Sequence, residues 1–154
     1  INSQNQIIIS GPVDQIDKSV ELLKQNNIKK IVKLNVSGAF HSPLMREANV
    51  SLNKVINSVN FKDSNFALYQ NVYPNKIFDG KKIKENLKSQ LCGSVNWLQI
   101  IKNMKINNID TIFEIGPKNV LSKLIKKIEP SIVVKSLDKI SDLVDAGFSI
   151  GIKK

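Results

Sequence analysis

The chain has 154 residues, 42% of them hydrophobic and 23% charged, and a formal net charge of +10. This length suits one compact unit, and the composition excludes the disordered and fibrous classes. The apolar runs are strand-sized and far shorter than the ~20 residues that a membrane-spanning helix needs. One cysteine, Cys92, permits no disulfide within the chain, and one histidine, His41, leaves too few ligands for most zinc sites. We therefore expect no membrane span and no metal.

The positive charge raises the question of nucleic-acid binding, because a basic surface gains affinity for nucleic acid by releasing counterions. Almost all of the 23 basic residues are lysines, and Arg46 is the only arginine that could contact a base in a planar, bidentate way. The aromatic residues do not alternate with the lysines as a stacking platform would require. We therefore expect no nucleic acid, and we interpret the lysine-rich surface as one that faces an acidic protein partner. The abundance of Lys, Ile and Asn indicates an AT-rich genome.

The first 36 residues predict a β-α-β unit. A β-branched run over residues 6–10 indicates a strand that Gly11 and Pro12 end, and helical spacing of apolar residues follows over residues 13–26. A second apolar run over residues 28–36 predicts another strand. Such a unit packs one helix against a sheet.

A loop of small residues over 37–43 comes next, with His41 in it. Ser42 can cap a helix and Pro43 can occupy its first turn, so a helix is predicted over residues 44–59. The remaining pattern alternates strands and helices, which predicts an α/β fold. The predicted strands are 66–72, 111–115 and 132–135, and the predicted helices are 82–91, 97–105, 119–127 and 141–146.

His41 is the first candidate for chemistry. A lone histidine is more often structural than catalytic, but functional side chains are frequently carried by loops on a rigid frame. Imidazole is also the side chain best suited to move protons at neutral pH. The residues alone make His41 a candidate general base.

The loop resembles a known family at this point. Residues 36–45, VSGAFHSPLM, resemble the histidine motif of malonyl-CoA:acyl-carrier-protein transacylases of type II fatty acid synthesis. Three further segments resemble motifs of that family in the same order along the chain. They are residues 7–11 (IIISG), 90–97 (QLCGSVNW) and 113–125 (FEIGPKNVLSKLI).

The resemblance implies a fold and a domain arrangement. Members of this family have a large α/β-hydrolase-like subdomain with an inserted ferredoxin-like small one, and are about twice as long as this chain. Residues 1–35 would be the closing β-α-β of the small subdomain, and residues 36–154 the C-terminal part of the large one. The chain starts at Ile1 without an initiator methionine or a signal-peptide pattern, so we expect an internal start in a longer gene product.

The resemblance also implies a ping-pong reaction, in which a serine takes malonyl from malonyl-CoA and passes it to the phosphopantetheine thiol of acyl carrier protein. His41 would be the base that activates the serine. Gln90 would supply the carbonyl oxygen that accepts the other ring N–H and holds the tautomer. No cofactor is implied beyond these two substrates, and the serine would lie in the family's N-terminal half, which becomes an expected partner.

Two further site residues follow from the resemblance. Asn71 matches an asparagine near the site, although a residue at a strand-end turn is the plainer interpretation. Phe40 matches a position whose bulk disfavours a methyl-branched malonyl group, although it could be an ordinary packing residue. Both are predicted to contact substrate.

Some residues argue against a simple match. Lys118 and Ser94 stand where the family usually has glycine and proline, which puts the turn geometry there in doubt. Gly147-Phe148-Ser149-Ile150-Gly151 has the spacing of a nucleophile elbow, but it follows a predicted helix instead of a strand, so Ser149 is not expected to be the nucleophile. Arg46 does not match the arginine that binds the malonyl carboxylate.

Two alternatives remain at this point. The chain could be part of a polyketide-synthase acyltransferase domain, or a non-catalytic interaction module that descends from the family. An intracellular location is expected in every case, in the cytoplasm of a bacterium or in a plastid-like organelle of an AT-rich eukaryote.

Overall fold

The computed structural model describes residues 1–148, so the predicted exclusion of Ser149 lies outside the described residues. The chain divides into two compact units, Ile1–Ile100 and Ile101–Lys154. The division does not test the expected boundary after Asn35, which stays a prediction. No helix within the described part of the chain is long and apolar enough to cross a membrane.

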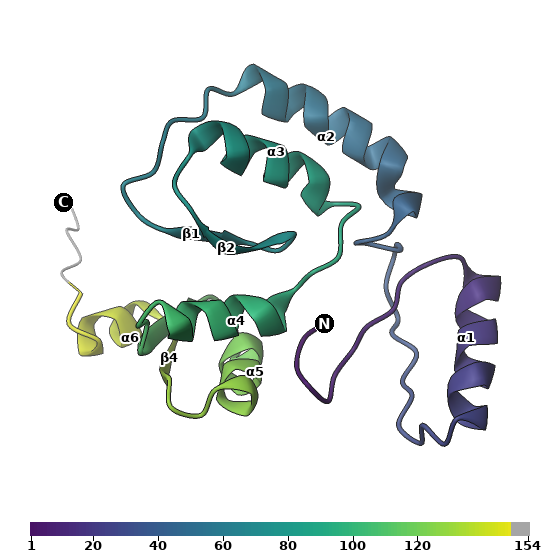
Figure 1. The fold of residues 1–154 in the computed structure, drawn as a ribbon. Helices are drawn as coiled ribbons and strands as arrows, with labels where there is room; N and C mark the ends of the chain where they lie inside the picture. Colours follow the sequence, from purple (N-terminus) through teal and green to yellow (C-terminus); the bar gives the residue numbers. More distant parts are fainter. Residues whose placement is uncertain (149–154) are drawn as a thin grey trace. The chain divides into compact units, whose positions relative to one another are not determined.

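The N-terminal part of the first unit contains helix α1, Val13–Gln25, which begins after Pro12 and ends at Asn26. Figure 1 shows α1 between two extended segments that carry no strand arrows. The strands predicted over residues 6–10 and 28–36 are therefore wrong, since in the described chain residues 1–36 contain only an isolated bridge between Ser3 and Gln6. A strand needs a neighbour for its backbone groups, and neither segment finds one. Most of their apolar side chains are exposed, among them Ile7 at 66% and Val32 at 68%, and Ile31 is partly covered.

The rest of the first unit places two helices beside a hairpin (Figure 1). The predicted helix over 44–59 is divided into a 3₁₀ turn, Pro43–Met45, and helix α2, Arg46–Ser58. The buried Ser42 hydroxyl accepts the N–H of Leu44 at 3.3 Å, which is the predicted cap. Helix α3, Gly80–Gln90, contacts α2 and is capped by Asp79, whose side chain accepts the N–H of Lys82 at 2.9 Å.

The hairpin consists of strand β1, Leu68–Gln70, and strand β2, Tyr73–Ile77, which pair antiparallel. Strand β1 lies within the predicted strand, but β2 was not predicted. Its sequence, YPNKI, contains a proline and little alternation of apolar and polar residues, and proline is uncommon in strands except at edges. The turn between the strands is formed by Asn71 and Val72.

Helix α4, Trp97–Ile106, runs through the division between the units. The second unit then continues with strand β3, Thr111–Ile115, helix α5, Val120–Ile128, strand β4, Val133–Leu137, and helix α6, Ile140–Asp145. Each of these elements lies within two residues of its predicted bounds.

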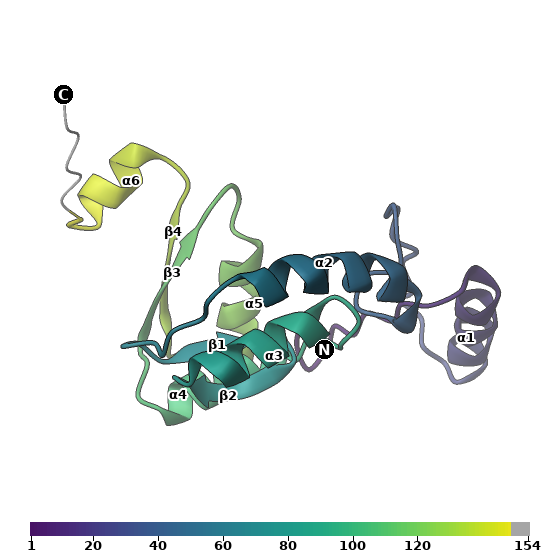
Figure 2. The same ribbon diagram turned by 90° about the horizontal axis from the view of Figure 1, so that it is seen from above.

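Strands β3 and β4 form the parallel pair of the second unit, with Thr111 opposite Val133 and Ile115 opposite Leu137 (Figure 2). Helix α5 contacts β4 and buries one face, which carries Leu124, Ile125 and Ile128. Helices alternating with a parallel pair confirm the α/β class.

Candidate active site

His41 lies in a turn between the extended segment before it and the 3₁₀ turn that starts at Pro43. Its φ angle is +62°, a left-handed conformation that is uncommon for residues other than glycine, although histidine adopts it more often than most. The N–H of His41 donates to the carbonyl oxygen of Leu91 at 3.0 Å. This hydrogen bond ties the turn to the segment that follows α3.

The imidazole of His41 is held by the end of α3 and by the same segment. Its Nδ1 lies 3.0 Å from the backbone carbonyl oxygen of Gln90 and 3.2 Å from that of Gly93. Carbonyl oxygens only accept hydrogen bonds, so Nδ1 carries the proton in both contacts. In the neutral ring Nε2 is then the atom with a free lone pair, and it can accept a proton from a substrate or a nucleophile.

The structure therefore brings together His41 and Gln90, which lie 49 residues apart in the chain. The group that Gln90 offers to the ring is its main-chain carbonyl at the last residue of α3. The last carbonyls of a helix lack partners within the helix, which leaves this one available to the imidazole. The contact depends on where α3 ends, and the glutamine side chain takes no part in it.

Phe40 precedes His41 and is 46% exposed. Its ring lies next to Gly38, where a Cβ atom would be 3.5 Å from Cε2 of the phenylalanine. The exposure of the ring does not separate substrate contact from ordinary packing, because Phe66 and Phe78 are exposed as well, at 79% and 45%. Its contact with substrate stays a prediction.

Asn71 occupies the hairpin turn, as the plainer interpretation predicted, and its carbonyl oxygen accepts the N–H of Asn96 at 3.0 Å. The neighbouring Val72 packs against Gly93, one of the residues that hold His41. Asn71 is thus linked to the histidine turn through the backbone, and a contact between its side chain and substrate stays a prediction.

The sequence did not reveal the parts played by Leu91 and Gly93. Both act through backbone carbonyl oxygens, which every residue type possesses, so no side-chain pattern marks them. The one signal in the sequence is the glycine itself, two residues after the end of the helix predicted over 82–91.

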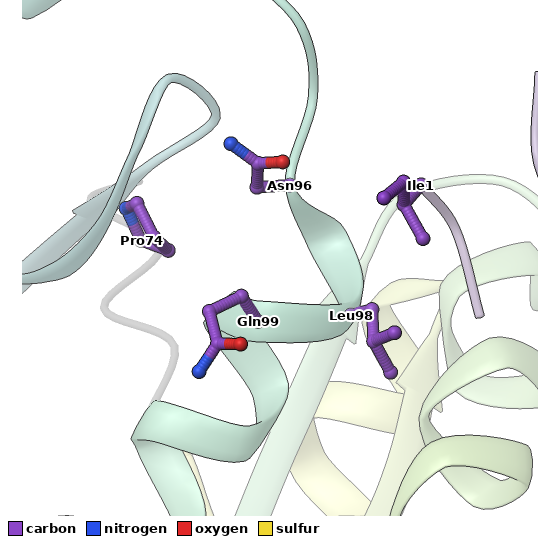
Figure 3. A pocket seen from close by; sticks show the side chains of 5 residues that line it. All are labelled: Ile1, Pro74, Asn96, Leu98 and Gln99. Carbon is purple, nitrogen blue, oxygen red and sulfur yellow. The ribbon is translucent and has the colours of Figure 1, made fainter. Parts of the chain in front are cut away.

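Figure 3 shows the five residues that line a pocket in the first unit, Ile1, Pro74, Asn96, Leu98 and Gln99. The volume of this pocket is about 300 Å³. Its lining does not include His41, Phe40 or Asn71. The pocket therefore gives no support to the histidine site. No group of three or more His, Cys, Asp or Glu side chains within residues 1–148 is placed to hold a metal ion.

A second polar cluster lies in the other unit, around Glu114 of β3. Its carboxylate accepts the N–H of Leu121 at 2.9 Å and that of Ser122 at 2.8 Å, in the first turn of α5. The hydroxyl of Ser122 also donates to Glu114, and lies 2.7 Å from the hydroxyl of Ser136 on β4. Asn119, before α5, makes no side-chain cap, so Glu114 satisfies the free N–H groups of that helix in its place.

These contacts change the acidity of Glu114. Burial by itself raises the pKa of this carboxyl, but the hydrogen bonds from Ser122, Leu121 and Ser136 stabilise the charged form and together lower the pKa below 4.5. The hydroxyl of Ser122 is buried and turned toward the carboxylate. The cluster is thus a structural clamp between β3, α5 and β4, although it contains a serine and an acid.

Lys118 lies in the turn before α5 with a φ angle of +73°. This left-handed conformation explains why a glycine would suit the position better. The doubt raised by the sequence about this turn therefore has a structural basis.

The comparisons with known proteins point to one family. The malonyl CoA-acyl carrier protein transacylase of Bacillus subtilis (strain 168) is 36% identical to this chain over 128 residues, which are 83% of the chain and 40% of the relative. The protein of the same name from Staphylococcus aureus (strain MSSA476) is 35% identical over 93% of the chain and 46% of the relative. The chain thus spans less than half the length of these relatives. No protein-family model matches it.

Comparison with solved structures points to the same family. The crystal structure of the enzyme from Streptococcus pneumoniae superposes with a TM-score of 0.88 at 31% identity, over 94% of this chain and 47% of the other. The malonyl-CoA:ACP transacylase of Synechocystis sp. PCC 6803 gives a TM-score of 0.84 at 32% identity, over 94% and 48%. The chain is therefore a homologue of the malonyl-CoA:acyl-carrier-protein transacylases and has the fold of just under half of such a protein.

Proposed function

We propose that this chain supplies the histidine half of an enzyme that transfers malonyl from malonyl-CoA to the phosphopantetheine thiol of acyl carrier protein. The observation that carries the proposal is the pair of hydrogen-bond contacts that Nδ1 of His41 makes with the carbonyl oxygens of Gln90 and Gly93. This leaves Nε2 as the basic atom. The names of the relatives supply the substrates, malonyl-CoA and acyl carrier protein.

In the proposed reaction a serine from the remaining half attacks the thioester carbonyl of malonyl-CoA while Nε2 of His41 takes its proton. The imidazolium then protonates the departing CoA thiolate, and a malonyl ester remains on the serine. In the second half-reaction Nε2 deprotonates the phosphopantetheine thiol, which attacks the ester. The same proton returns to the serine, so the histidine ends as it began.

The site needs three things from elsewhere, by the resemblance to the family: the nucleophilic serine, the donors that stabilise the oxyanion and an arginine for the malonyl carboxylate. Arg46 is an exposed residue at the start of α2, which suits a solvated side chain. The N-terminal half of the enzyme is therefore a proposed partner, together with the two substrates. No cofactor is required by this chemistry.

The net charge of +10 favours binding to an acidic carrier protein and to the phosphates of CoA. Phe40, half exposed beside the histidine, is proposed to limit the acyl group to malonyl by its bulk. Asn71 is proposed to help bind the substrate near the same turn. An intracellular site of action, in a bacterial cytoplasm or a plastid-like organelle, is proposed because the compared transacylases come from bacteria.

The proposal is tested with a hybrid in which this chain replaces the matched 47% of the Streptococcus pneumoniae transacylase. We expect malonyl transfer by the hybrid, and a loss of about 10²–10⁴-fold on His41→Ala, the usual contribution of a general base. Arg46→Ala, one turn further along, is the matched control and should retain the activity. A hybrid that folds but transfers equally well with His41→Ala would favour the non-catalytic module.

The acyl-CoA preference of the hybrid distinguishes the polyketide-synthase alternative from the malonyl-specific transacylase. We expect the hybrid to prefer malonyl-CoA over methylmalonyl-CoA, and Phe40→Ser to weaken that preference. The ratio of kcat/KM for the two substrates measures it. Equal use of both by the unaltered hybrid would contradict the assignment to the malonyl-specific enzymes.

A further inference from the structure

The last residue of α3 and the three residues after it make three hydrogen bonds to His41, all through main-chain carbonyl oxygens. Leu91 accepts the backbone N–H of His41, whereas Gln90 and Gly93 accept the ring Nδ1–H. We call residues 90–93 the carbonyl loop. Because His41 has a left-handed backbone at φ +62°, its conformation is costly and must be held by its surroundings. The carbonyl loop is what holds it.

The carbonyl loop is itself held at Gly93. The N–H of Gly93 donates to the carbonyl oxygen of Ser89 at 2.8 Å, which continues the last turn of α3. A Cβ atom at this position would lie 2.5 Å from Cγ1 of Val72 and 2.9 Å from the carbonyl oxygen of Ser89. Both distances are shorter than Cβ atoms normally allow. The loop therefore lies directly on Val72 of the hairpin turn, and no side chain fits between them.

From this we propose that Gly93 is a positioning residue for His41, because the missing side chain lets the carbonyl loop reach the Nδ1–H of the ring and fix its tautomer. A side chain at residue 93 would lift the loop from Val72 and move both acceptors away from Nδ1. The ring could then carry its proton on Nε2, the atom that must be unprotonated to act as a base. The consequence for catalysis rests on the proposed function, but the effect on the ring does not.

The tautomer can be read directly, because His41 is the single histidine of the sequence. The chain is labelled with ¹⁵N-histidine, and the ring nitrogen shifts are measured by NMR at a pH where the imidazole is neutral. In the unaltered chain we expect one set of signals, with Nδ1 protonated and Nε2 bare. In Gly93→Ala the Nδ1–H form should fall from the dominant species to a minority.

Gly11→Ala is the matched control, since a Cβ atom there would meet nothing closer than 4.0 Å, at Ile16. It should leave the ring signals unchanged. Adding Val72→Ala to Gly93→Ala removes the closer of the two overlaps and should restore most of the Nδ1–H form. A merely structural glycine would give no such rescue of the tautomer.

If Gly93→Ala prevents folding, Val72→Leu crowds the same contact from the other side and leaves residue 93 unaltered. Its folded form should show the same loss of the Nδ1–H species. A folded Gly93→Ala or Val72→Leu chain that keeps Nδ1 protonated would overturn the proposal. The spectrum needs no substrate and no other half of an enzyme, so this result is independent of whether the hybrid transfers malonyl.

Discussion

Two stretches of this chain have the same sequence pattern and different structures. Residues 6–36 and residues 111–137 both predict strand, helix and strand. In the second stretch β3 and β4 pair along five positions, and α5 buries Leu124, Ile125 and Ile128. In the first stretch α1 forms, but it has no buried residue, and within the described chain the segments on either side of it form no strand and make only the isolated bridge of Gln6 with Ser3.

The difference shows what a pattern of apolar residues can specify. It specifies the local conformation, and α1 forms within one residue of its predicted end. It does not specify whether a neighbouring strand is available. Strands β3 and β4 are each other's neighbour, whereas the segments around α1 need a partner from outside residues 1–36.

Amide hydrogen exchange should show the largest difference between the two stretches. Backbone N–H groups in the β3–β4 ladder should exchange at least about a hundredfold more slowly than those of residues 6–10 and 28–36. Opening the ladder costs local unfolding free energy, and each ~1.4 kcal/mol corresponds to a factor of ten. Mass spectrometry of exchanged peptides measures it. Equal protection in the two stretches would mean that the segments around α1 are paired.

Substitutions in the core of the second unit should give the next largest effect, a loss in the free energy of unfolding. Ile125→Ala removes a fully buried side chain from α5 and should lower the free energy of unfolding by about 2–5 kcal/mol. Leu22→Ala on α1 is the matched control: its side chain is 59% exposed, so the change should stay within about 0.5 kcal/mol. Urea unfolding followed by circular dichroism compares the two. A large loss with Leu22→Ala would show that α1 is packed after all.

Glu114 should make a smaller contribution to the free energy of unfolding, and one that depends on pH. Glu114→Gln removes the charge that accepts hydrogen bonds from Leu121 and Ser122, and should cost about 1–3 kcal/mol at neutral pH. The folded state lowers the pKa of this carboxyl below 4.5, so its contribution is complete above about pH 4.5 and is lost as the pH falls through the folded value.

The measurement is the midpoint of urea unfolding against pH for both forms. The two curves should converge in acid, below pH 4.5. Glu21→Gln on the exposed side of α1 is the control and should show no such difference. A constant gap between Glu114→Gln and the unaltered chain at every pH would show that lost packing, and not lost charge, is responsible.

The smallest effect should come from the turn before α5. Lys118→Gly relieves a left-handed φ of +73° and should raise the free energy of unfolding by up to about 1 kcal/mol, since glycine also loses more entropy on folding. Asn108→Gly, at φ +60°, is the comparison, and should gain less because asparagine tolerates this conformation. Thermal unfolding ranks the two, and the reverse order would remove the strain argument for Lys118.

The sequence predicted the α/β class, every helix of the described chain to within about two residues and the strands β3 and β4. It missed β2, whose Tyr73 and Pro74 lack a strand pattern, and it wrongly gave strands to residues 6–10 and 28–36. The first error comes from weak local preference, and the second from a partner that no local pattern can supply.

The candidate site was predicted unevenly. His41 was a candidate general base from its loop alone, whereas Gln90 came from the resemblance to the transacylases, because no periodicity relates residues that lie 49 positions apart. The left-handed backbone of His41 and the contacts that Leu91 and Gly93 make with it became visible only in three dimensions. They depend on main-chain atoms, which the residue types do not encode.

The central claim is that His41 serves a nucleophile outside this chain. It is tested most directly by making the hybrid as two polypeptides and recording intact masses under denaturing conditions after incubation with malonyl-CoA. We predict one added malonyl group on the other polypeptide, and its loss on His41→Ala. A malonyl group on this chain instead would place the nucleophile within its 154 residues, return attention to Ser149 and contradict the account.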